Sequence, residues 1–219
     1  MKTAICYFSG TGNSLDIANK LTNTIAGELF FIPRITDDDV AAFDRVIIIA
    51  PIYSFGIPIP VKAFIESMKN FTSKEYHVIL HYGGFSGNAA NYTKMYFESC
   101  GLQAHSIHKM KMPENFTVSA TVPPFYIRKA LNASGKQVNT IAKSINNGEK
   151  KIPRKNIFAF CDGLHEKNAA KWASMSENFI VTDRCPGAAI NYGEKTIGKA
   201  RYQNPNVDFS KMEGRGNAY

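Results

Sequence analysis

The stretch best suited to chemistry is a short run of glycines and side-chain hydrogen-bond donors near the amino end, Ser9-Gly10-Thr11-Gly12-Asn13-Ser14. An apolar run precedes it and a segment with helical spacing of apolar residues follows, which predicts a strand, a tight turn and a helix start. Backbone N–H groups and the helix N-terminus then converge on one spot that favours an anion. The glycines let the backbone approach a phosphate closely, and the run contains no Lys or Arg. We therefore expect a phosphate site made of neutral donors; the alternative is an ordinary turn rich in Ser and Gly.

Two common phosphate-binding motifs do not match this run. A nucleotide-hydrolysing P-loop ends in Gly-Lys-Ser or Gly-Lys-Thr, whereas Asn13 and Ser14 follow Gly12. A dinucleotide-binding fingerprint has a Gly or Ala three residues after its second glycine, and Leu15 stands there. Both motifs are therefore excluded.

Strands and helices are expected to alternate along the chain. Apolar runs typical of buried parallel strands span residues 2–8, 29–32, 45–50, 76–82 and 102–110. Helical spacing of apolar residues spans 14–26, 61–69, 89–100 and 125–147, with a brief helical turn at 40–43. This alternation predicts an α/β fold with a parallel sheet.

Two more loops directly follow expected strands. One runs from Pro51 to Pro58 and carries two aromatic residues; the other runs from Gly83 to Asn88 and is rich in glycine. Open parallel sheets bind ligands at the carboxyl ends of their strands, the edge where residues 9–14 are also expected. The alternative is that the aromatic side chains only pack their loop onto the sheet.

The run at residues 9–14 resembles the first loop of the flavodoxin family, whose pattern Ser/Thr-x-Thr-Gly-x-Ser/Thr holds the terminal phosphate of FMN. The resemblance implies a flavodoxin-like three-layer α/β sandwich with a five-stranded parallel sheet in the order 2-1-3-4-5. It further implies that Tyr53 stacks on the flavin, with Phe55 as the second choice and Gly56 as the flexible point. Backbone N–H groups of the third loop would lie near the pyrimidine oxygens of the ring. The FMN-binding residues implied in this way are Ser9, Gly10, Thr11, Gly12, Asn13, Ser14, Pro51, Ile52, Tyr53, Ser54, Phe55, Gly56, Tyr82, Gly83, Gly84 and Phe85.

Candidate metal ligands are few, and we expect no metal site. Three consecutive aspartates at 37–39 favour the cap of a helical turn, because neighbouring residues at a helix start point in different directions; a metal cluster is the alternative. His105 and His108 are expected on opposite faces of a strand, which argues against a shared metal. His81 is expected to pack within its strand rather than to ionise beside a ligand.

Composition and charge narrow the class of protein. A 20% charged fraction with no apolar run of about 18 residues, and no signal-peptide pattern, predicts a cytoplasmic protein without membrane insertion. Residues 1–127 hold 10 Lys or Arg and 10 Asp or Glu, whereas residues 128–219 hold 16 and 8, so the net charge of +8 lies in the C-terminal part. Flavodoxins are usually acidic. The basic part therefore favours an acidic redox partner, or is a solvated face without a specific partner.

A C-terminal extension, residues 150–219, follows the expected flavodoxin-like domain of residues 1–149. Within the extension, the sequence favours a short strand at 156–160 and a helix at 164–179. Two pieces of it, Cys185-Pro186-Gly187-Ala188-Ala189-Ile190 and Arg201-Tyr202, resemble the end of a fusion family that joins a flavodoxin-like domain to a ferredoxin with two [4Fe-4S] clusters. Each cluster needs four thiolates, and only Cys185 remains here. Cys6, Cys100 and Cys161 are expected to be buried free thiols. We hypothesise that the ferredoxin module is missing, that its flanks pack on the first domain, and that this chain holds no iron–sulfur cluster.

Three functions are compatible with these features. The first is an FMN-binding redox protein that passes electrons to a redox partner protein or a small-molecule acceptor. The second is an FMN-dependent reductase of the NAD(P)H:quinone type, which needs an open cavity over the flavin. The third is a non-enzymatic binding module with a basic partner surface; nucleic acid is disfavoured because the basic residues form no recognition motif. No catalytic triad or carboxylate pair is evident, so no catalytic side chain is expected, and the oligomeric state is not set by the sequence.

Overall fold

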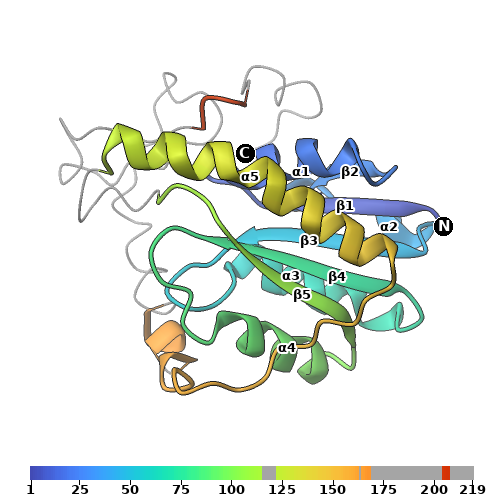
Figure 1. Cartoon of the computed structure of the whole chain (residues 1–219). Helices are drawn as coiled ribbons and strands as arrows, with labels where there is room; N and C mark the ends of the chain where they lie inside the picture. The colour runs from blue at the N-terminus through green and yellow to red at the C-terminus, as the bar shows by residue number, and fades with distance from the viewer. Residues whose placement is uncertain (115–121, 163, 169–203, 208–219) are drawn as a thin grey trace, which may run out of the picture.

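A parallel sheet between two helical layers forms the centre of the protein, which we describe from a computed structural model (Figure 1). The structure describes residues 1–114, 122–162, 164–168 and 204–207. The strands are β1 (Thr3–Tyr7), β2 (Glu28–Phe31), β3 (Arg45–Pro51), β4 (Glu75–Tyr82) and β5 (Ala104–Lys111). They are all parallel, in the order β2-β1-β3-β4-β5. The fold class and strand order expected from the sequence are therefore confirmed.

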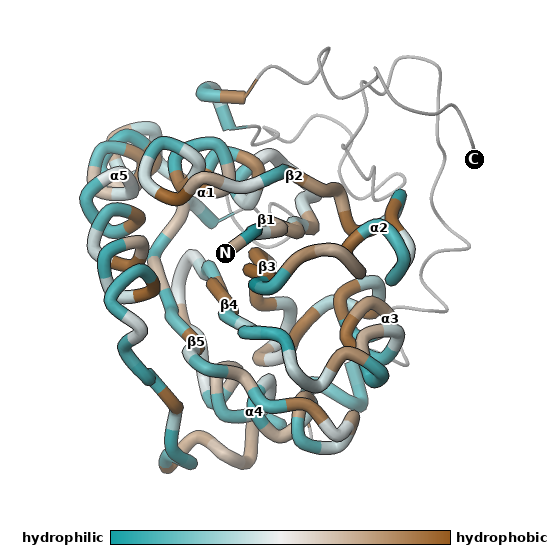
Figure 2. The backbone as a smooth tube through the Cα atoms, turned by 90° about the vertical axis from the view of Figure 1, so that its right-hand side faces the viewer, coloured by the Kyte–Doolittle hydropathy of each residue, from teal (hydrophilic) through white to brown (hydrophobic). Residues whose placement is uncertain are grey.

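Helices connect the strands and cover both faces of the sheet. They are α1 (Asn13–Thr22), α2 (Asp37–Ala41), α3 (Ile59–Ser67), α4 (Ala89–Ser99) and α5 (Pro124–Asn146), with short 3₁₀ turns at Ile32–Arg34 and Met68–Asn70. Figure 2 looks along the sheet, with α1 and α5 on one face and α2, α3 and α4 on the other. This arrangement gives the three layers.

Two apolar cores lie on the two faces because successive strand residues point to opposite sides. In β3, Val46, Ile48 and Ala50 face the core under α3 and α4, whereas Ile47 and Ile49 face the core under α1 and α5. All five side chains are fully buried. Strands that are apolar on both faces are typical of the centre of a parallel sheet, so the apolar run 45–50 correctly indicated a central strand.

The residues after α5 add to the far edge of the sheet. Lys151 forms a parallel bridge to Ser106, and its carbonyl accepts a hydrogen bond of 2.9 Å from the Ile107 N–H. Residues 157–160 form a turn, so the short strand expected at 156–160 is wrong. Asn156 supplies the reason: its side-chain oxygen accepts the Phe158 N–H at 2.8 Å, a local bond that favours a turn over a strand. Helical residues begin at 161 and continue through 168, with residue 163 undescribed.

The aspartate run and three of the cysteines lie in the described part of the chain. The aspartates at 37–39 begin α2, where the Asp39 carboxylate accepts the Thr36 N–H at 2.8 Å in a capping box. The thiols of Cys6, Cys100 and Cys161 are free; Cys100 is only partly buried, so the expected burial is wrong at that position. Burial raises the pKa of the Cys6 thiol, which keeps it protonated.

Candidate functional site

Three loops meet where β1, β3 and β4 end, at the left-hand edge of the sheet in Figure 1. The first loop is residues 8–12, the second is 52–58 and the third is 83–88. The three strands are neighbours in the sheet and run in the same direction, so the loops that leave their carboxyl ends lie side by side. The sequence-predicted site residues all belong to these loops or to the element ends beside them.

The first loop leads into α1 through a left-handed glycine. Gly12 has φ 91°, a conformation that favours glycine, and its N–H donates to Ser9 Oγ at 3.0 Å. Ser9 accepts this bond and keeps its own O–H as a donor. The first bond of the helix runs from the Asp16 N–H to the Gly12 carbonyl at 2.9 Å. The N–H groups of Ser14 and Leu15 therefore precede the helical hydrogen bonds, at the positive end of the helix dipole.

Two donor side chains of the run point into the protein. The Asn13 amide donates to the Pro113 carbonyl at 3.0 Å, and the Ser14 hydroxyl is joined to His81 Nε2 by a 2.8 Å hydrogen bond. Both residues are almost completely buried. Their side chains fix the shape of the first loop, while Phe8, Gly10 and Thr11 are its partly exposed members.

His81 links the first loop to the end of β4. Burial lowers its pKa to about 3, because the charged imidazolium cannot be solvated there. The ring is therefore neutral at physiological pH and adds no positive charge to the site. The expectation that His81 packs within its strand is confirmed.

The second loop is a tight hairpin. The N–H groups of Tyr53 and Gly56 donate to each other's carbonyls at 2.9 and 3.1 Å. Ser54 and Phe55 between them have φ 48° and 74°, left-handed values that cost free energy in residues other than glycine. Gly56 itself is buried with no positive φ. The unusual backbone therefore lies at Ser54 and Phe55, two residues and one residue before Gly56, which was expected to be the flexible point.

Tyr53 brings the second loop against the first. Its ring lies edge-on to Phe8 at 6.4 Å between centroids. A Cβ placed on Gly10 would lie 3.2 Å from the Tyr53 hydroxyl. The glycine therefore allows the tyrosine side chain to lie close above the first loop.

Aromatic contacts join the second loop to the third. The Phe55 and Phe85 rings lie 5.9 Å apart, and a Cβ on Gly87 would approach Phe55 Cδ1 to 2.8 Å. Phe85 is 53% exposed, so its ring forms part of the surface. The pairs Tyr53–Gly10 and Phe55–Phe85 thus connect the second loop to the first and the third, and the Ser14–His81 hydrogen bond joins the start of α1 to the end of β4 beside them.

Glu114 is a neighbour of the third loop that the sequence did not indicate. Its carboxylate accepts the Gly84 N–H at 3.3 Å, and a Cβ on Gly83 would lie 2.6 Å from Glu114 Cα. Gly83 is therefore required because the chain after β5 passes close beside it. Nothing local in the sequence marks Glu114, which lies 30 residues from its partner.

Residues 156–168 of the C-terminal extension pack against the second and third loops. His165 Nδ1 is hydrogen-bonded to the Tyr53 carbonyl at 2.9 Å, and a Cβ on Gly56 would lie 2.5 Å from the His165 ring. Lys62 of α3 forms an ion pair with Glu166 at 3.2 Å. The rings of Phe158 and Phe85 are 4.7 Å apart. Asn204, in another described piece of the extension, contacts the first loop.

His105 and His108 do not lie at this edge. His105 Nδ1 accepts the Tyr76 N–H, and His108 Nε2 is joined to Ser106 Oγ at 2.9 Å. Among the residues that the structure describes, no group of three or more His, Cys, Asp or Glu side chains is arranged to hold a metal ion. In the same part of the chain, no helix has the length and apolar character needed to span a membrane. Cys185, Arg201 and Tyr202 lie outside the described residues.

One family model and several solved structures match this chain. The family model described as the flavodoxin domain matches residues 4–116. A search of curated proteins finds no match. Among solved structures, Megasphaera elsdenii flavodoxin aligns at 21% identity and a TM-score of 0.47, over 61% of this chain and 98% of that one. Rubredoxin oxygen:oxidoreductase from Desulfovibrio gigas aligns at 15% identity and a TM-score of 0.46, over 67% of this chain and only 36% of that chain. A flavoprotein from Lactobacillus acidophilus, solved in complex with FMN, aligns at 18% identity and a TM-score of 0.40, over 49% of this chain and 92% of that one.

Proposed function

Because this chain belongs to the flavodoxin domain family, whose model spans just over half of it, we propose that it binds FMN where the three loops meet. Electrons would then pass through the bound flavin. The observation that carries the proposal is that the second loop contacts both other loops at one edge of the sheet, through Tyr53–Gly10 and Phe55–Phe85. The Ser14–His81 hydrogen bond joins the start of α1 to the end of β4 beside them. The loops and these elements together combine a helix N-terminus with aromatic side chains in one site.

The first loop fits a phosphate group in the chemistry of its donors. The N–H groups at the start of α1, the Ser9 hydroxyl and the partly exposed Thr11 supply neutral donors. The neutral His81 and the absence of Lys and Arg from the run mean that dipoles rather than a side-chain cation would hold the phosphate. Ser9 to Ser14 are the residues that we assign to this end of FMN.

The second and third loops fit an aromatic ring. Tyr53 and Phe55, both partly exposed, and Phe85 present aromatic side chains beside the first loop. We assign the ring end of FMN to Pro51–Gly56 and Tyr82–Phe85, with Tyr53 as the stacking residue. The Glu114 carboxylate, which accepts the Gly84 N–H, adds a negative charge at the third loop.

When bound, the flavin supplies the electron-transfer chemistry. The residues of this chain bind and orient it: hydrogen bonds within the first loop hold the phosphate donors in place, and the hairpin at Tyr53–Gly56 holds the aromatic residue. No side chain is required to transfer a proton in this function. An electron carrier therefore needs no more than this binding site and a flavin ring with one edge accessible to the partner.

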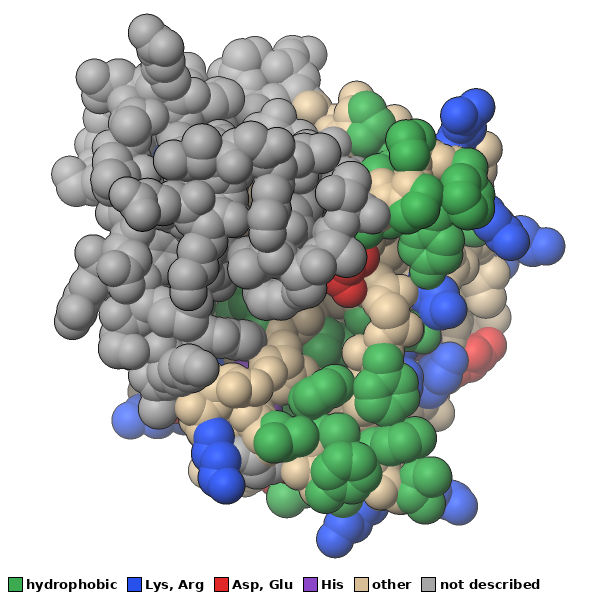
Figure 3. Space-filling view, turned by 90° about the vertical axis from the view of Figure 1, so that its left-hand side faces the viewer, with side chains coloured by type: hydrophobic (Ala, Val, Ile, Leu, Met, Phe, Trp, Pro, Cys, Tyr) green, Lys and Arg blue, Asp and Glu red, His purple; other side chains and the backbone are tan. Residues whose placement is uncertain are grey.

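An exposed apolar cluster beside the third loop supports a protein as the redox partner. Figure 3 views the molecule from the edge where the three loops lie, with hydrophobic side chains gathered in its lower part and Lys and Arg around them. Phe85, Ile157 and Phe160 are 53%, 84% and 68% exposed. Apolar surface with a basic margin suits a partner with an apolar centre and an acidic rim.

We further propose that residues 150–219 are an extension retained from a flavodoxin–ferredoxin fusion, packed on a flavodoxin-like domain of residues 1–149. The packing of residues 156–168 on the second and third loops supports an extension that belongs to the site. The single Cys185 cannot hold a [4Fe-4S] cluster. Electrons would therefore enter and leave through the flavin alone.

Titration of the purified protein with FMN, followed by its visible absorbance and flavin fluorescence, tests the proposed function. Saturable uptake of FMN is expected. A chain that takes up no flavin would overturn the proposal.

A further inference from the structure

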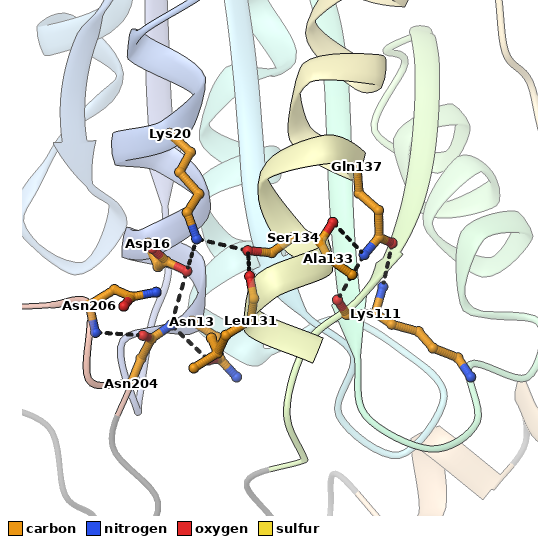
Figure 4. Close-up of polar contacts among 10 residues, drawn as sticks. All are labelled: Asn13, Asp16, Lys20, Lys111, Leu131, Ala133, Ser134, Gln137, Asn204 and Asn206. Atoms are coloured by element: carbon orange, nitrogen blue, oxygen red, sulfur yellow. Dashed lines mark hydrogen bonds and ion pairs between the residues drawn. The ribbon is translucent and has the colours of Figure 1, made fainter. Parts of the chain in front are cut away.

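Asn204 of the C-terminal extension lies beside Asn13 and Asp16 at the start of α1 (Figure 4). It is only 1% exposed. Its backbone N–H donates to the Thr11 carbonyl in the first loop at 2.9 Å. Its side-chain amide donates to Asn13 Oδ1 and Asp16 Oδ2, both at 3.2 Å. Its side-chain oxygen accepts the Asn206 N–H at 3.0 Å. Both polar atoms of this buried side chain therefore have partners.

These bonds fix the peptide between Thr11 and Gly12 from both sides. In a trans peptide the carbonyl and the N–H point in opposite directions. Here the Thr11 carbonyl accepts from the Asn204 N–H, while the Gly12 N–H donates to Ser9 Oγ. The peptide cannot rotate without loss of both bonds, so Asn204 helps to set the direction of the loop that leads into α1.

Asn204 also stabilises a buried negative charge next to the loop. Asp16 is 3% exposed and lies in the first turn of α1, at the end where a phosphate is proposed. Its carboxylate is paired with Lys20 at 2.7 Å, and Lys20 donates in turn to Ser134 Oγ of α5 at 2.7 Å. The Asn204 amide is a further donor to that carboxylate, from the side of the first loop.

Val207 holds this segment in the core. Its side chain is 9% exposed and packs in the apolar cluster under α1 and α5. Its N–H donates to the Asn204 carbonyl at 3.2 Å. Asn204 is therefore presented to the first loop by a buried anchor, and both Asn204 and Val207 lie outside residues 4–116 that the family model matches.

We propose that Asn204 is a positioning residue for the phosphate end of FMN, an inference that rests on the proposed function. It acts through Thr11, Asn13 and Asp16, which it holds in the arrangement that presents the loop donors. A residue with this role affects ligands that carry the phosphate and leaves those without it unaffected. FMN and riboflavin differ only in that phosphate, so they separate positioning of the loop from general stability.

The test measures dissociation constants for FMN and riboflavin in the full chain and in Asn204→Ala. The substitution removes the side-chain bonds to Asn13 and Asp16 at the start of α1 and keeps the backbone bond to Thr11. We expect FMN to bind about tenfold more weakly and riboflavin to bind within about twofold of the unmodified chain. Asn206→Ala is the matched control: Asn206 is exposed and contacts Asn204 through its backbone N–H, so both affinities should be retained. Far-UV circular dichroism verifies that each variant is folded.

Other results contradict the inference. Unchanged FMN affinity in Asn204→Ala, or an equal loss for FMN and riboflavin, would overturn it while the proposed function stands. If Asn204→Ala does not fold, Asn204→Ser supplies the same comparison, and failure of both to fold would assign Asn204 to stability alone and overturn the inference. An unmodified chain that binds neither flavin would overturn the proposed function and this inference together.

Discussion

His81 Nε2 and Ser14 Oγ lie 2.8 Å apart, and their hydrogen bond joins the end of β4 to the first turn of α1. Both side chains are buried, and the imidazole is neutral because burial lowers its pKa to about 3. A single polar contact thus connects the elements that flank the first and third loops at the proposed flavin site.

Replacement of His81 should separate its effect on acid stability from its effect on flavin binding. Below pH 6.5 the unfolded chain binds a proton at His81 that the folded chain does not, so the free energy of unfolding falls as the pH decreases towards 3. His81→Gln removes this titration and retains a polar atom near Ser14. We expect the slope of unfolding free energy against pH to become smaller, by at most about 1.4 kcal/mol per pH unit, with FMN affinity retained.

Urea unfolding between about pH 6.5 and about pH 5.5 measures this slope, in a range that lies above the usual pKa of 4.5 for Glu side chains. His108→Gln is the control: burial also lowers the pKa of His108, to about 4, but its partner is Ser106, away from the three loops. It should reduce the slope without a change in FMN affinity. His81→Leu leaves Ser14 without its partner and should weaken FMN binding about tenfold. An unchanged slope in His81→Gln would show that His81 does not titrate in this manner.

Gly56→Ala should disturb the contact between the second loop and the extension. The added Cβ would lie 2.5 Å from the His165 ring, a separation that requires the histidine or the hairpin to move. We expect a loss of about 1–3 kcal/mol in unfolding free energy and weaker FMN binding. The double variant Gly56→Ala/His165→Ala should recover part of the FMN affinity.

Gly135→Ala is the matched control for this substitution. Gly135 lies within α5, and a Cβ there meets nothing within 4 Å. Its replacement should leave stability unchanged or raise it by up to about 1 kcal/mol. If Gly56→Ala behaves like Gly135→Ala in thermal unfolding, the close packing of His165 on the hairpin is contradicted.

Tyr53→Ala should weaken FMN and riboflavin to a similar extent, because the proposed contact is with the ring that both share. Aromatic stacking on a nucleic-acid base is worth about 1–3 kcal/mol, which corresponds to a loss of roughly 5- to 150-fold if the flavin contact is similar. Tyr53→Phe keeps the ring and should bind nearly as well as the unmodified chain. Fluorescence titration of both ligands measures the change, and wild-type affinities in Tyr53→Ala would remove Tyr53 from the site.

The purified chain should contain only sub-stoichiometric iron and sulfide. Cys6 and Cys161 are buried, Cys100 is partly buried and far from them in sequence, and Cys185 retains none of the spacing of a ferredoxin motif. Elemental analysis and acid-labile sulfide assays check this after anaerobic purification. Stoichiometric iron and sulfide would contradict the loss of the cluster module.

Local sequence patterns predicted the fold and the three loops well, because the relevant signals are short in range. The run 45–50 showed burial on both faces, and the glycine run at 9–14 marked a strand-to-helix turn, both of which the structure confirms. The strand expected at 156–160 was wrong because the Asn156 side chain bonds the backbone two residues ahead and favours a turn.

The contacts that hold the loops in place could not be predicted in the same way. Asn204 meets Asp16 across 188 positions, and His165 meets Tyr53 across 112. Neither residue lies in a motif, because the partners of its hydrogen bonds are set by the tertiary fold. The left-handed backbone at Ser54 and Phe55 was also unexpected, because these residue types do not favour positive φ.

Titration of the freshly purified chain with FMN tests the central claim most directly. The proposed function predicts a yellow protein, or one that becomes yellow on reconstitution, with saturable binding of one FMN per chain and quenching of the flavin fluorescence. A colourless protein that takes up no FMN from an excess would contradict it.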